Sequence, residues 1–318
     1  MNHYTVEHVS FLSVNKVNTI SGIIYVPDSK PKGILQISHG MCEYIDRYVR
    51  FMSFLANEGY IVAGHDHLGH GKSSKEAEYG YFGAKDGYKN LVEDLHHMTL
   101  LVKAKYGDLP YVLLGHSMGS FIARLYLSDY SGELDGAIIC GTGGPVPMSS
   151  QGVKLANYLC KKKGEFYRSQ KLDRMLFGSF NDRIKPKRTP KDWLTRDASI
   201  VDKYLQDPKC MFTFTAAGFR DLMTLSTQAN IARWYESLSL NLPVLLISGD
   251  MDPVGNYGKG VTKVYERLKK TGLNDVSMIL YPGARHEILN ELNYREVYMD
   301  IEDWIKGLNA LEITSTSD

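Results

Sequence analysis

Short runs of apolar residues, several of them ending in a glycine, recur along most of the chain. The continuous runs lie at residues 33–40, 60–66, 111–117, 134–141, 243–250 and 276–283. Because they are apolar at successive positions, they are typical of parallel strands that helices cover on both faces. Two N-terminal runs, at residues 5–12 and 19–26, alternate apolar and polar positions and are also expected to be strands.

Helical patterns fill the intervals between the continuous runs, at residues 44–58, 88–105, 118–127, 258–271 and 291–308. This alternation predicts an α/β fold, a mostly parallel central sheet flanked by helices, whose ligands gather at the carboxyl ends of the strands. The rhythm breaks once, where only amphipathic and basic helical stretches occur. We therefore expect a core domain of residues 1–144 and 240–318, and a helical cap inserted at residues 145–239 over the carboxyl edge of the sheet.

The composition limits the classes of protein to which this chain can belong, but it does not identify one of them. The chain has 318 residues, 43% of them hydrophobic, and a formal net charge of +1, so bulk electrostatics does not indicate a nucleic-acid partner. The N-terminal segment lacks a secretory pattern, no run is long enough for a membrane span, and the four cysteines are scattered. These features favour a cytoplasmic protein with reduced thiols. The sequence does not indicate an oligomeric state.

The segment at residues 111–127, YVLLGHSMGSFIARLYL, carries the strongest chemical signal. An apolar strand leads through the G-x-S-x-G pentapeptide centred on Ser117 into a helix. In this context the serine lies on a sharp turn that needs small neighbours two residues away, and its hydroxyl projects at the helix N-terminus. The alternative is a turn in which Ser117 only caps the helix.

A serine nucleophile needs a histidine base and an acid that orients it, in the chain order serine, acid, histidine. His286 follows the last predicted strand and a Pro-Gly turn, and is the expected base. Asp252 and Asp250 both follow the preceding strand. Asp252 is preferred, because the following proline holds its backbone extended, and Asp250 stays the alternative.

The tetrahedral intermediate of ester cleavage needs two backbone N–H donors. The residue after the nucleophile, Met118, supplies one of them. The loop QISHGMCEYIDRY at residues 36–48 follows an earlier strand, and its Gly40 lets the backbone turn inward, so Met41 is the expected second donor.

Four stretches together are similar to one known family. GHSMG, SHGMCEYIDRY, DHLGHGKS and SGDMDPVG…ARHE resemble the monoacylglycerol lipase and lysophospholipase branch of the α/β-hydrolases, also labelled serine aminopeptidase-like. The resemblance implies a cap over the active site, the triad Ser117, Asp252 and His286, and Met41 and Met118 as oxyanion donors. It also favours Asp252 over Asp250. The family pattern H-G-x-x-E-H is kept at Glu43, but Tyr44 replaces its last histidine.

The stretch HDHLGHGKSS contains three histidines, His65, His67 and His70, spaced as in a metallo-hydrolase signature. The position where that signature has its aspartate is Gly69. A tight loop in which Gly69 and Gly71 adopt positive φ explains the stretch without a metal, and in the resembled family this loop is architectural. A metal-dependent hydrolase that uses the three histidines stays a minor alternative.

These inferences predict a serine ester hydrolase that forms an acyl-enzyme, needs no cofactor and binds a small acyl ester: a monoacylglycerol, a lysophospholipid or a simple ester. Apolar cap residues are expected to line the acyl pocket, although several must form the core of the cap: Phe212, Phe214, Phe219, Leu222 and Met223. The lysine-rich part of the cap is interpreted first as a solvated helix face, and alternatively as a peripheral contact with lipid surfaces.

Two rival functions remain open at this point. An aminopeptidase of the same fold would need a cap carboxylate to hold the substrate amine, and Glu165, Asp173 and Asp192 are the candidates. A binding protein without catalysis is the other rival, but such proteins usually have a broken triad.

Overall fold

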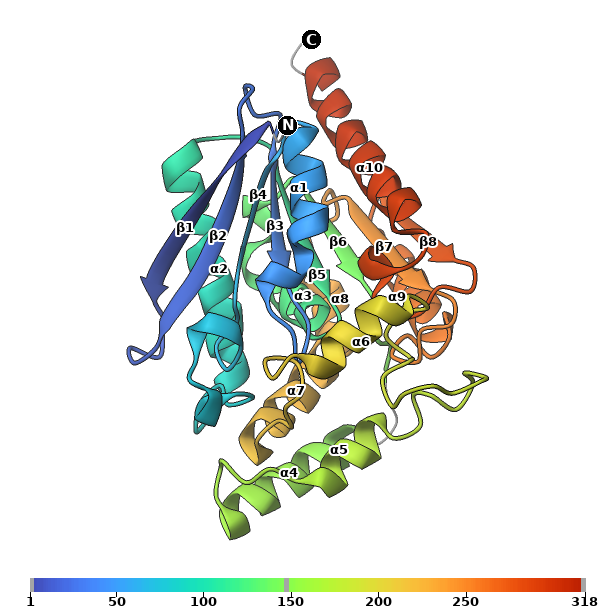
Figure 1. Cartoon of the computed structure of the whole chain (residues 1–318). Helices are drawn as coiled ribbons and strands as arrows, with labels where there is room; N and C mark the ends of the chain where they lie inside the picture. The colour runs from blue at the N-terminus through green and yellow to red at the C-terminus, as the bar shows by residue number, and fades with distance from the viewer. Residues whose placement is uncertain (1–2, 146–148, 316–318) are drawn as a thin grey trace.

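The computed structural model describes residues 3–145 and 149–315, with the side chains of residue 149 and of residues 309–315 outside the description. The first residues of the predicted cap, 146–148, therefore lie outside the described residues. Within the described ranges, eight strands form a single sheet in the order β1-β2-β4-β3-β5-β6-β7-β8 (Figure 1). The strands are β1 (Tyr4–Leu12), β2 (Thr19–Pro27), β3 (Ile34–Ser38), β4 (Ile61–His65), β5 (Tyr111–His116), β6 (Gly136–Cys140), β7 (Val244–Gly249) and β8 (Val276–Tyr281).

The sheet is parallel from β4 to β8, whereas β2 pairs antiparallel with both β1 and β4. Every residue of the central strands β3, β4, β5, β6 and β7 is buried, as their continuous apolar runs predict. The edge strand β1 alternates between half-buried and exposed residues along most of its length. The predicted α/β fold with a mostly parallel sheet is confirmed.

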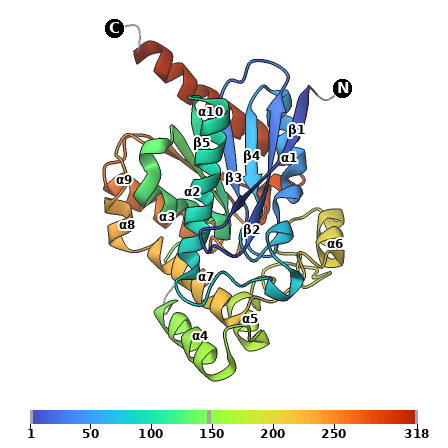
Figure 2. The ribbon, with the colours of Figure 1, turned by 90° about the vertical axis from the view of Figure 1, so that its left-hand side faces the viewer.

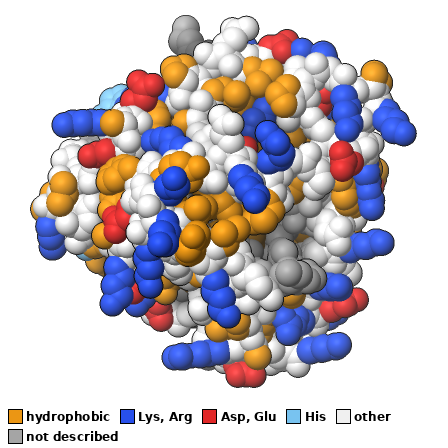
Figure 3. Space-filling model, turned by 90° about the horizontal axis from the view of Figure 1, so that it is seen from below, with side chains coloured by type: hydrophobic (Ala, Val, Ile, Leu, Met, Phe, Trp, Pro, Cys, Tyr) orange, Lys and Arg blue, Asp and Glu red, His pale blue; other side chains and the backbone are white. Residues whose placement is uncertain are grey.

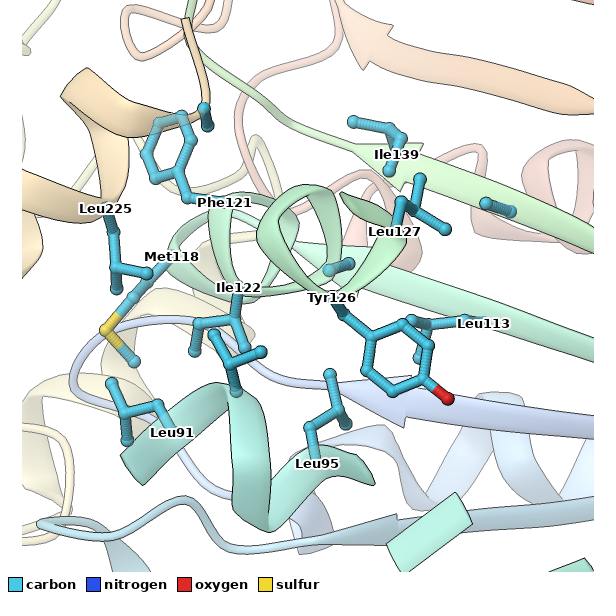
Figure 4. Packing of buried hydrophobic residues seen from close by; sticks show 14 of the residues in the cluster. Leu91, Leu95, Leu113, Met118, Phe121, Ile122, Tyr126, Leu127, Ile139 and Leu225 are labelled. Atoms are coloured by element: carbon cyan, nitrogen blue, oxygen red, sulfur yellow. The ribbon is translucent and has the colours of Figure 1, made fainter. Parts of the chain in front are cut away.

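Helices cover both faces of the sheet and form two separate hydrophobic cores (Figures 1 and 2). On one face lie α1 (Val49–Asn57) and α10 (Tyr294–Ser315), and on the other α2 (Gly87–Tyr106), α3 (Met118–Tyr130) and α9 (Lys259–Lys270). Figure 4 shows how Met118, Ile122 and Tyr126 of α3 pack toward Leu91 and Leu95 of α2. This packing fixes the helix that begins directly after the predicted nucleophile.

In the described part of the chain between β6 and β7, five helices lie toward the end of the sheet where the parallel strands finish (Figure 1). They are α4 (Ser149–Lys163), α5 (Gln170–Phe177), α6 (Ala198–Gln206), α7 (Ala216–Gln228) and α8 (Ala232–Glu236). We refer to residues 149–239 as the cap segment. It contains no strand in its described part, and α7 joins α4 to α2 and α3 of the core. Its division from the core as a separate domain stays a prediction.

A fully buried arginine, Arg124 of α3, ties both ends of the cap segment to the core. Its guanidinium donates to Thr142 Oγ1 and the Gly143 carbonyl just before the segment, and to the Ala229 carbonyl and Asn230 Oδ1 near its end. No carboxylate of the described residues pairs with it. Burial lowers the pKa of Arg124 to about 10, so the guanidinium stays charged and holds these oxygens by charge-assisted hydrogen bonds.

Among the described residues, no helix combines the length and the apolar character that crossing a membrane requires.

Replacing Arg124 with methionine should lower the free energy of unfolding by about 3 kcal/mol, because several buried oxygens lose their donor. Urea denaturation of the wild type and the variant measures this change. Arg233→Met is the matched control, because Arg233 is an exposed arginine on α8, and it should change the free energy by less than about 0.5 kcal/mol. Equal stability of the two variants would show that Arg124 is not the tie described here.

Candidate active site

Ser117 lies on the turn between β5 and α3, in a backbone conformation that only close packing can maintain. Its φ is 55° and its ψ is −119°, which is strained for a residue with a side chain. A Cβ at Gly119 would lie 2.0 Å from the Ser38 carbonyl oxygen, and one at Gly115 would lie 2.4 Å from the Gly119 carbonyl oxygen. The glycines of the pentapeptide are therefore required by the approach of β3 and α3 to the turn.

The structure brings the three predicted triad residues together from three loops at the carboxyl edge of the sheet. His286 Nε2 lies 2.8 Å from Ser117 Oγ, and His286 Nδ1 lies 2.9 Å from Asp252 Oδ2. Asp252 also accepts hydrogen bonds from the backbone N–H of Val254 and the hydroxyl of Ser248. His286 and Asp252 are buried, so this row of hydrogen bonds can take a proton from the serine hydroxyl and stabilise the resulting imidazolium.

Asp250, the alternative acid, has a different environment. Its Oδ1 accepts a hydrogen bond of 2.7 Å from the backbone N–H of Gly283, in the turn that precedes His286. Asp250 thus holds the turn between β8 and the histidine loop.

The predicted oxyanion donors flank Ser117. The ideal Cβ position of Gly40 lies 3.0 Å from the Ser117 Cβ, so the loop that carries Met41 passes close to the serine. Among the described residues, the backbone N–H of Met41 has no hydrogen-bond acceptor. The N–H of Met118 belongs to the first turn of α3, whose leading N–H groups have no partner within the helix. Both N–H groups can therefore donate to an oxygen above Ser117.

A buried polar network that the sequence analysis did not predict supports this loop. Glu43 Oε1 accepts hydrogen bonds from the Gly40 N–H at 2.5 Å and the Tyr48 hydroxyl at 2.8 Å, and lies 3.0 Å from His116 Nδ1. Arg47 binds Glu43 and makes two hydrogen bonds, of 2.9 and 2.7 Å, with Glu287. The network therefore joins the oxyanion loop to the residue that follows His286.

The pKa values of Glu43 and His116 in this network are shifted in opposite directions. Burial alone would raise the pKa of Glu43, but the hydrogen bond and charge of His116, with the charge of Arg47, hold it well below its usual range. Burial alone would lower the pKa of His116, but Glu43 raises it above its usual value. Both shifts favour an ion pair of protonated His116 and ionised Glu43 beneath the turn that carries Ser117.

The residues of this network do leave a pattern in the sequence, although the pattern is weak. Glu43 and Arg47 are four residues apart, and Glu287 directly follows the predicted base. Such pairs occur on many surface helices, so their burial in one network could not be inferred without the fold.

The cap segment also contacts the histidine loop directly. The Trp193 ring lies 5.2 Å from the His286 ring, measured between centroids, and the Leu194 carbonyl accepts a hydrogen bond from the Glu287 N–H. Tyr44, where the family pattern has histidine, donates a 2.6 Å hydrogen bond to Asp207, so it fastens the oxyanion loop to the end of α6.

A cavity of about 680 Å³ opens above Ser117, between the core and the cap segment. Apolar and aromatic side chains form much of its wall, as is usual for small-molecule sites. Three of the five predicted pocket residues line it: Phe212, Leu222 and Met223. The expectation for Phe214 and Phe219 is corrected, because both are fully buried and neither is among the lining residues. The Phe214 ring instead packs on Phe82 and Phe219, where α7 meets the core.

The histidine-rich loop lies buried beside the oxyanion loop. Between ring centroids, His39 lies 4.4 Å from His67 and 5.3 Å from His70. Burial lowers the pKa values of His65 and His70 to about 3. These rings are therefore neutral and act as packed core. Gly69 and Gly71 have φ values of +78° and +48°, as predicted for a tight loop. In the described part of the chain, no three His, Cys, Asp or Glu side chains are placed to hold a metal ion.

A mostly parallel sheet with a serine after β5, an acid after β7 and a histidine after β8 defines the class of this protein as an α/β-hydrolase. A family model described as Serine aminopeptidase, S33 matches residues 29–293. The chain belongs to this family.

Lipases and esterases are among the proteins to which the chain is similar. Monoacylglycerol lipase of Mycolicibacterium smegmatis is 27% identical over 302 residues, which cover 94% of this chain and 96% of the relative. A thermostable carboxyl esterase from Bacillus coagulans, solved with glycerol, is 35% identical with a TM-score of 0.90 and covers 96% of this chain and 99% of its own. A lipase in an open form is 27% identical with a TM-score of 0.87, over the same shares of the two chains. The protein is a serine ester hydrolase of the α/β-hydrolase fold.

The variant Glu43→Gln should lose the most stability at mildly acidic pH. The depressed pKa of Glu43 stabilises the fold above the pKa of an unfolded glutamate, near 4.3, and the gain is lost as the pH falls. The raised pKa of His116 stabilises it below the pKa of an unfolded histidine, near 6.5, and the gain is lost as the pH rises through the folded value. The loss caused by the variant should therefore reach about 3 kcal/mol between these pKa values and shrink on both sides.

Urea denaturation of the wild type and Glu43→Gln from pH 4 to pH 9 measures this profile. A stability difference that does not change with pH would mean that the Glu43–His116 pair is not ionised in the fold.

Proposed function

We propose that Ser117 is the nucleophile of a two-step ester hydrolysis, with His286 as base and Asp252 as the acid that orients it. The observation that carries the proposal is the row of hydrogen bonds from Ser117 Oγ through His286 to Asp252. His286 Nε2 accepts the serine proton as Oγ attacks the ester carbonyl, and then protonates the leaving alcohol. The N–H groups of Met41 and Met118 stabilise the oxyanion. Water releases the acid from the acyl-enzyme by the same steps, so no cofactor is needed.

We further propose that the substrates are monoesters with an apolar acyl chain, such as monoacylglycerols, lysophospholipids or simple acyl esters. The wall of the cavity supports this, because Phe121, Leu176 and Leu222 offer an apolar surface next to Ser117. The names of the relatives, a monoacylglycerol lipase and a carboxyl esterase among them, support the same class.

Hydrolysis of p-nitrophenyl esters from short to long acyl chains, beside 1-monoacylglycerols, tests the proposal. The wild type should prefer medium or long chains, because each buried methylene adds about 0.8 kcal/mol of favourable transfer. Ser117→Ala should lower kcat on every ester by roughly 10⁴-fold or more. Turnover that survives this substitution would mean that another residue is the nucleophile.

The acid is tested in the same assay. Asp252→Asn should lower kcat by roughly 10⁴-fold, because the histidine loses its orienting carboxylate. Asp250→Asn is the matched control and should retain most of the activity, since the Asp250 carboxylate binds the Gly283 N–H. The reverse ranking of the two variants would assign the acid to Asp250.

We also propose that the outer face of α4 and α5 contacts anionic lipid surfaces. Residues 149–190 contain eleven Lys and Arg against three Asp and Glu. Figure 3 views the molecule from this side, where hydrophobic side chains lie among many Lys and Arg. Exposed apolar residues of α4 and α5 include Leu155, Tyr158 and Met175, and both Leu155 and Met175 also line the cavity. A lipid surface in contact with this face would therefore adjoin the cavity mouth.

Met175→Asp should weaken binding to phosphatidylglycerol-containing vesicles by roughly tenfold, because an apolar contact is replaced by a like charge. Co-sedimentation with these vesicles and with pure phosphatidylcholine vesicles measures the effect. Met299→Asp on α10 is the matched control, since Met299 is equally exposed but far along the chain from the basic face. Equal binding by both variants would place the lipid contact elsewhere.

A further inference from the structure

Three carboxylates of the cap segment were candidates for a substrate contact, and their environments differ. Glu165 accepts a hydrogen bond from the Tyr81 hydroxyl. Asp192 accepts hydrogen bonds from the backbone N–H groups of Arg188 and Thr189. The side chain of Asp173 makes no hydrogen bond or ion pair with any described residue.

Asp173 is also the one of the three that lines the cavity above Ser117. It lies in the first turn of α5, half-buried, and Cys42 lines the same cavity. Met41 lines this cavity too, so Asp173 belongs to the same cavity wall as the expected oxyanion loop.

A lysine shares this cavity. Lys191 lines the same cavity as Asp173, and its ammonium lies 5.9 Å from the centroid of the Trp193 ring and 5.7 Å from that of the Tyr204 ring. Burial raises the pKa of Asp173, and the charge of Lys191 opposes this rise. The cavity therefore presents an acceptor without a protein donor beside a cationic donor, within a wall that is otherwise largely apolar.

A partly desolvated carboxylate without a donor is costly, and a bound ligand that supplies a donor removes this cost. An acyl chain has no donor to offer, whereas the alcohol part of a polyol monoester carries free hydroxyls. A hydroxyl can donate to a carboxylate and accept from an ammonium. A substrate ammonium would instead meet the like charges of Lys191 and Lys263, since the other lining carboxylates, Glu43 and Glu287, are already paired with Arg47.

We propose that Asp173 is a specificity-determining residue that accepts a hydrogen bond from a free hydroxyl on the alcohol part of the ester, with Lys191 beside it. This inference rests on the proposed ester hydrolysis at Ser117. It assigns a polyol monoester as the preferred substrate over an ester of the same acyl chain whose alcohol has no further hydroxyl. It also means that Asp173 binds a neutral hydroxyl of the substrate, whereas in an aminopeptidase a cap carboxylate would bind the substrate amine.

The test compares 1-monoacylglycerol with the methyl ester of the same fatty acid. Asp173→Ala should lower the ratio of kcat/KM for the monoacylglycerol to kcat/KM for the methyl ester by about tenfold. The change should come from a lower kcat/KM for the monoacylglycerol. Asp173→Asn keeps the size and one acceptor, and should lower the ratio by a smaller factor. Asp182→Ala is the matched control, because Asp182 is an exposed cap aspartate paired with Lys187, and it should keep the wild-type ratio.

The alternative is that the Asp173 carboxylate, in the first turn of α5, only stabilises this helix by interacting with its dipole. In that case Asp173→Ala lowers thermal stability and leaves the ratio unchanged, which overturns the proposal. A selective loss on amino-acid esters, with the monoacylglycerol ratio kept, also overturns it and assigns an ammonium to Asp173. A wild type inactive on every ester, or activity that survives Ser117→Ala, would instead reject the ester hydrolysis itself.

Discussion

The close approach of three backbone segments at the end of β5 is the constraint on which the site depends. Gly119 lies against the Ser38 carbonyl, and Gly115 against the first turn of α3, so the turn between them has no room to relax. Ser117 keeps its strained φ because the sheet and α3 are fixed by two large cores. The proposed nucleophile, held in this way, needs no reorganisation when substrate arrives, which is the property that electrostatic catalysis requires.

The buried charges beneath this turn have a related role. Glu43 binds the Gly40 N–H, His116 belongs to the nucleophile turn, and Arg47 connects both to Glu287 beside the histidine. Buried ion pairs contribute little net stability when their desolvation is counted, but they are strongly directional. Here the directional contacts link the three loops that must keep a fixed relative position. Burying these charges adds little net stability to the fold, but it keeps the three loops in a fixed arrangement.

The sequence predicted the fold and the chain order of the site because both leave local signals. Continuous apolar runs identify buried strands, and a glycine on each side of Ser117 identifies the turn. Side-chain partners across the fold leave no such signal. Glu43 was noticed only as a motif position, and Phe214 and Phe219 could not be distinguished from Phe212, because all three are aromatic residues near the start of α7. Which of them meets a cavity depends on how α7 packs on Gly80 and Phe82.

The contacts of Arg124 have a consequence for how this scaffold can diversify. Two junctions, at Gly143 before the cap segment and at Asn230 after α7, are both held by one side chain of α3. The distance between the two junctions is thereby set by the core, whatever lies between them. We therefore expect that this pair of junctions can accept cap segments of other lengths and sequences, which would make the two positions natural splice points for chimaeras between relatives.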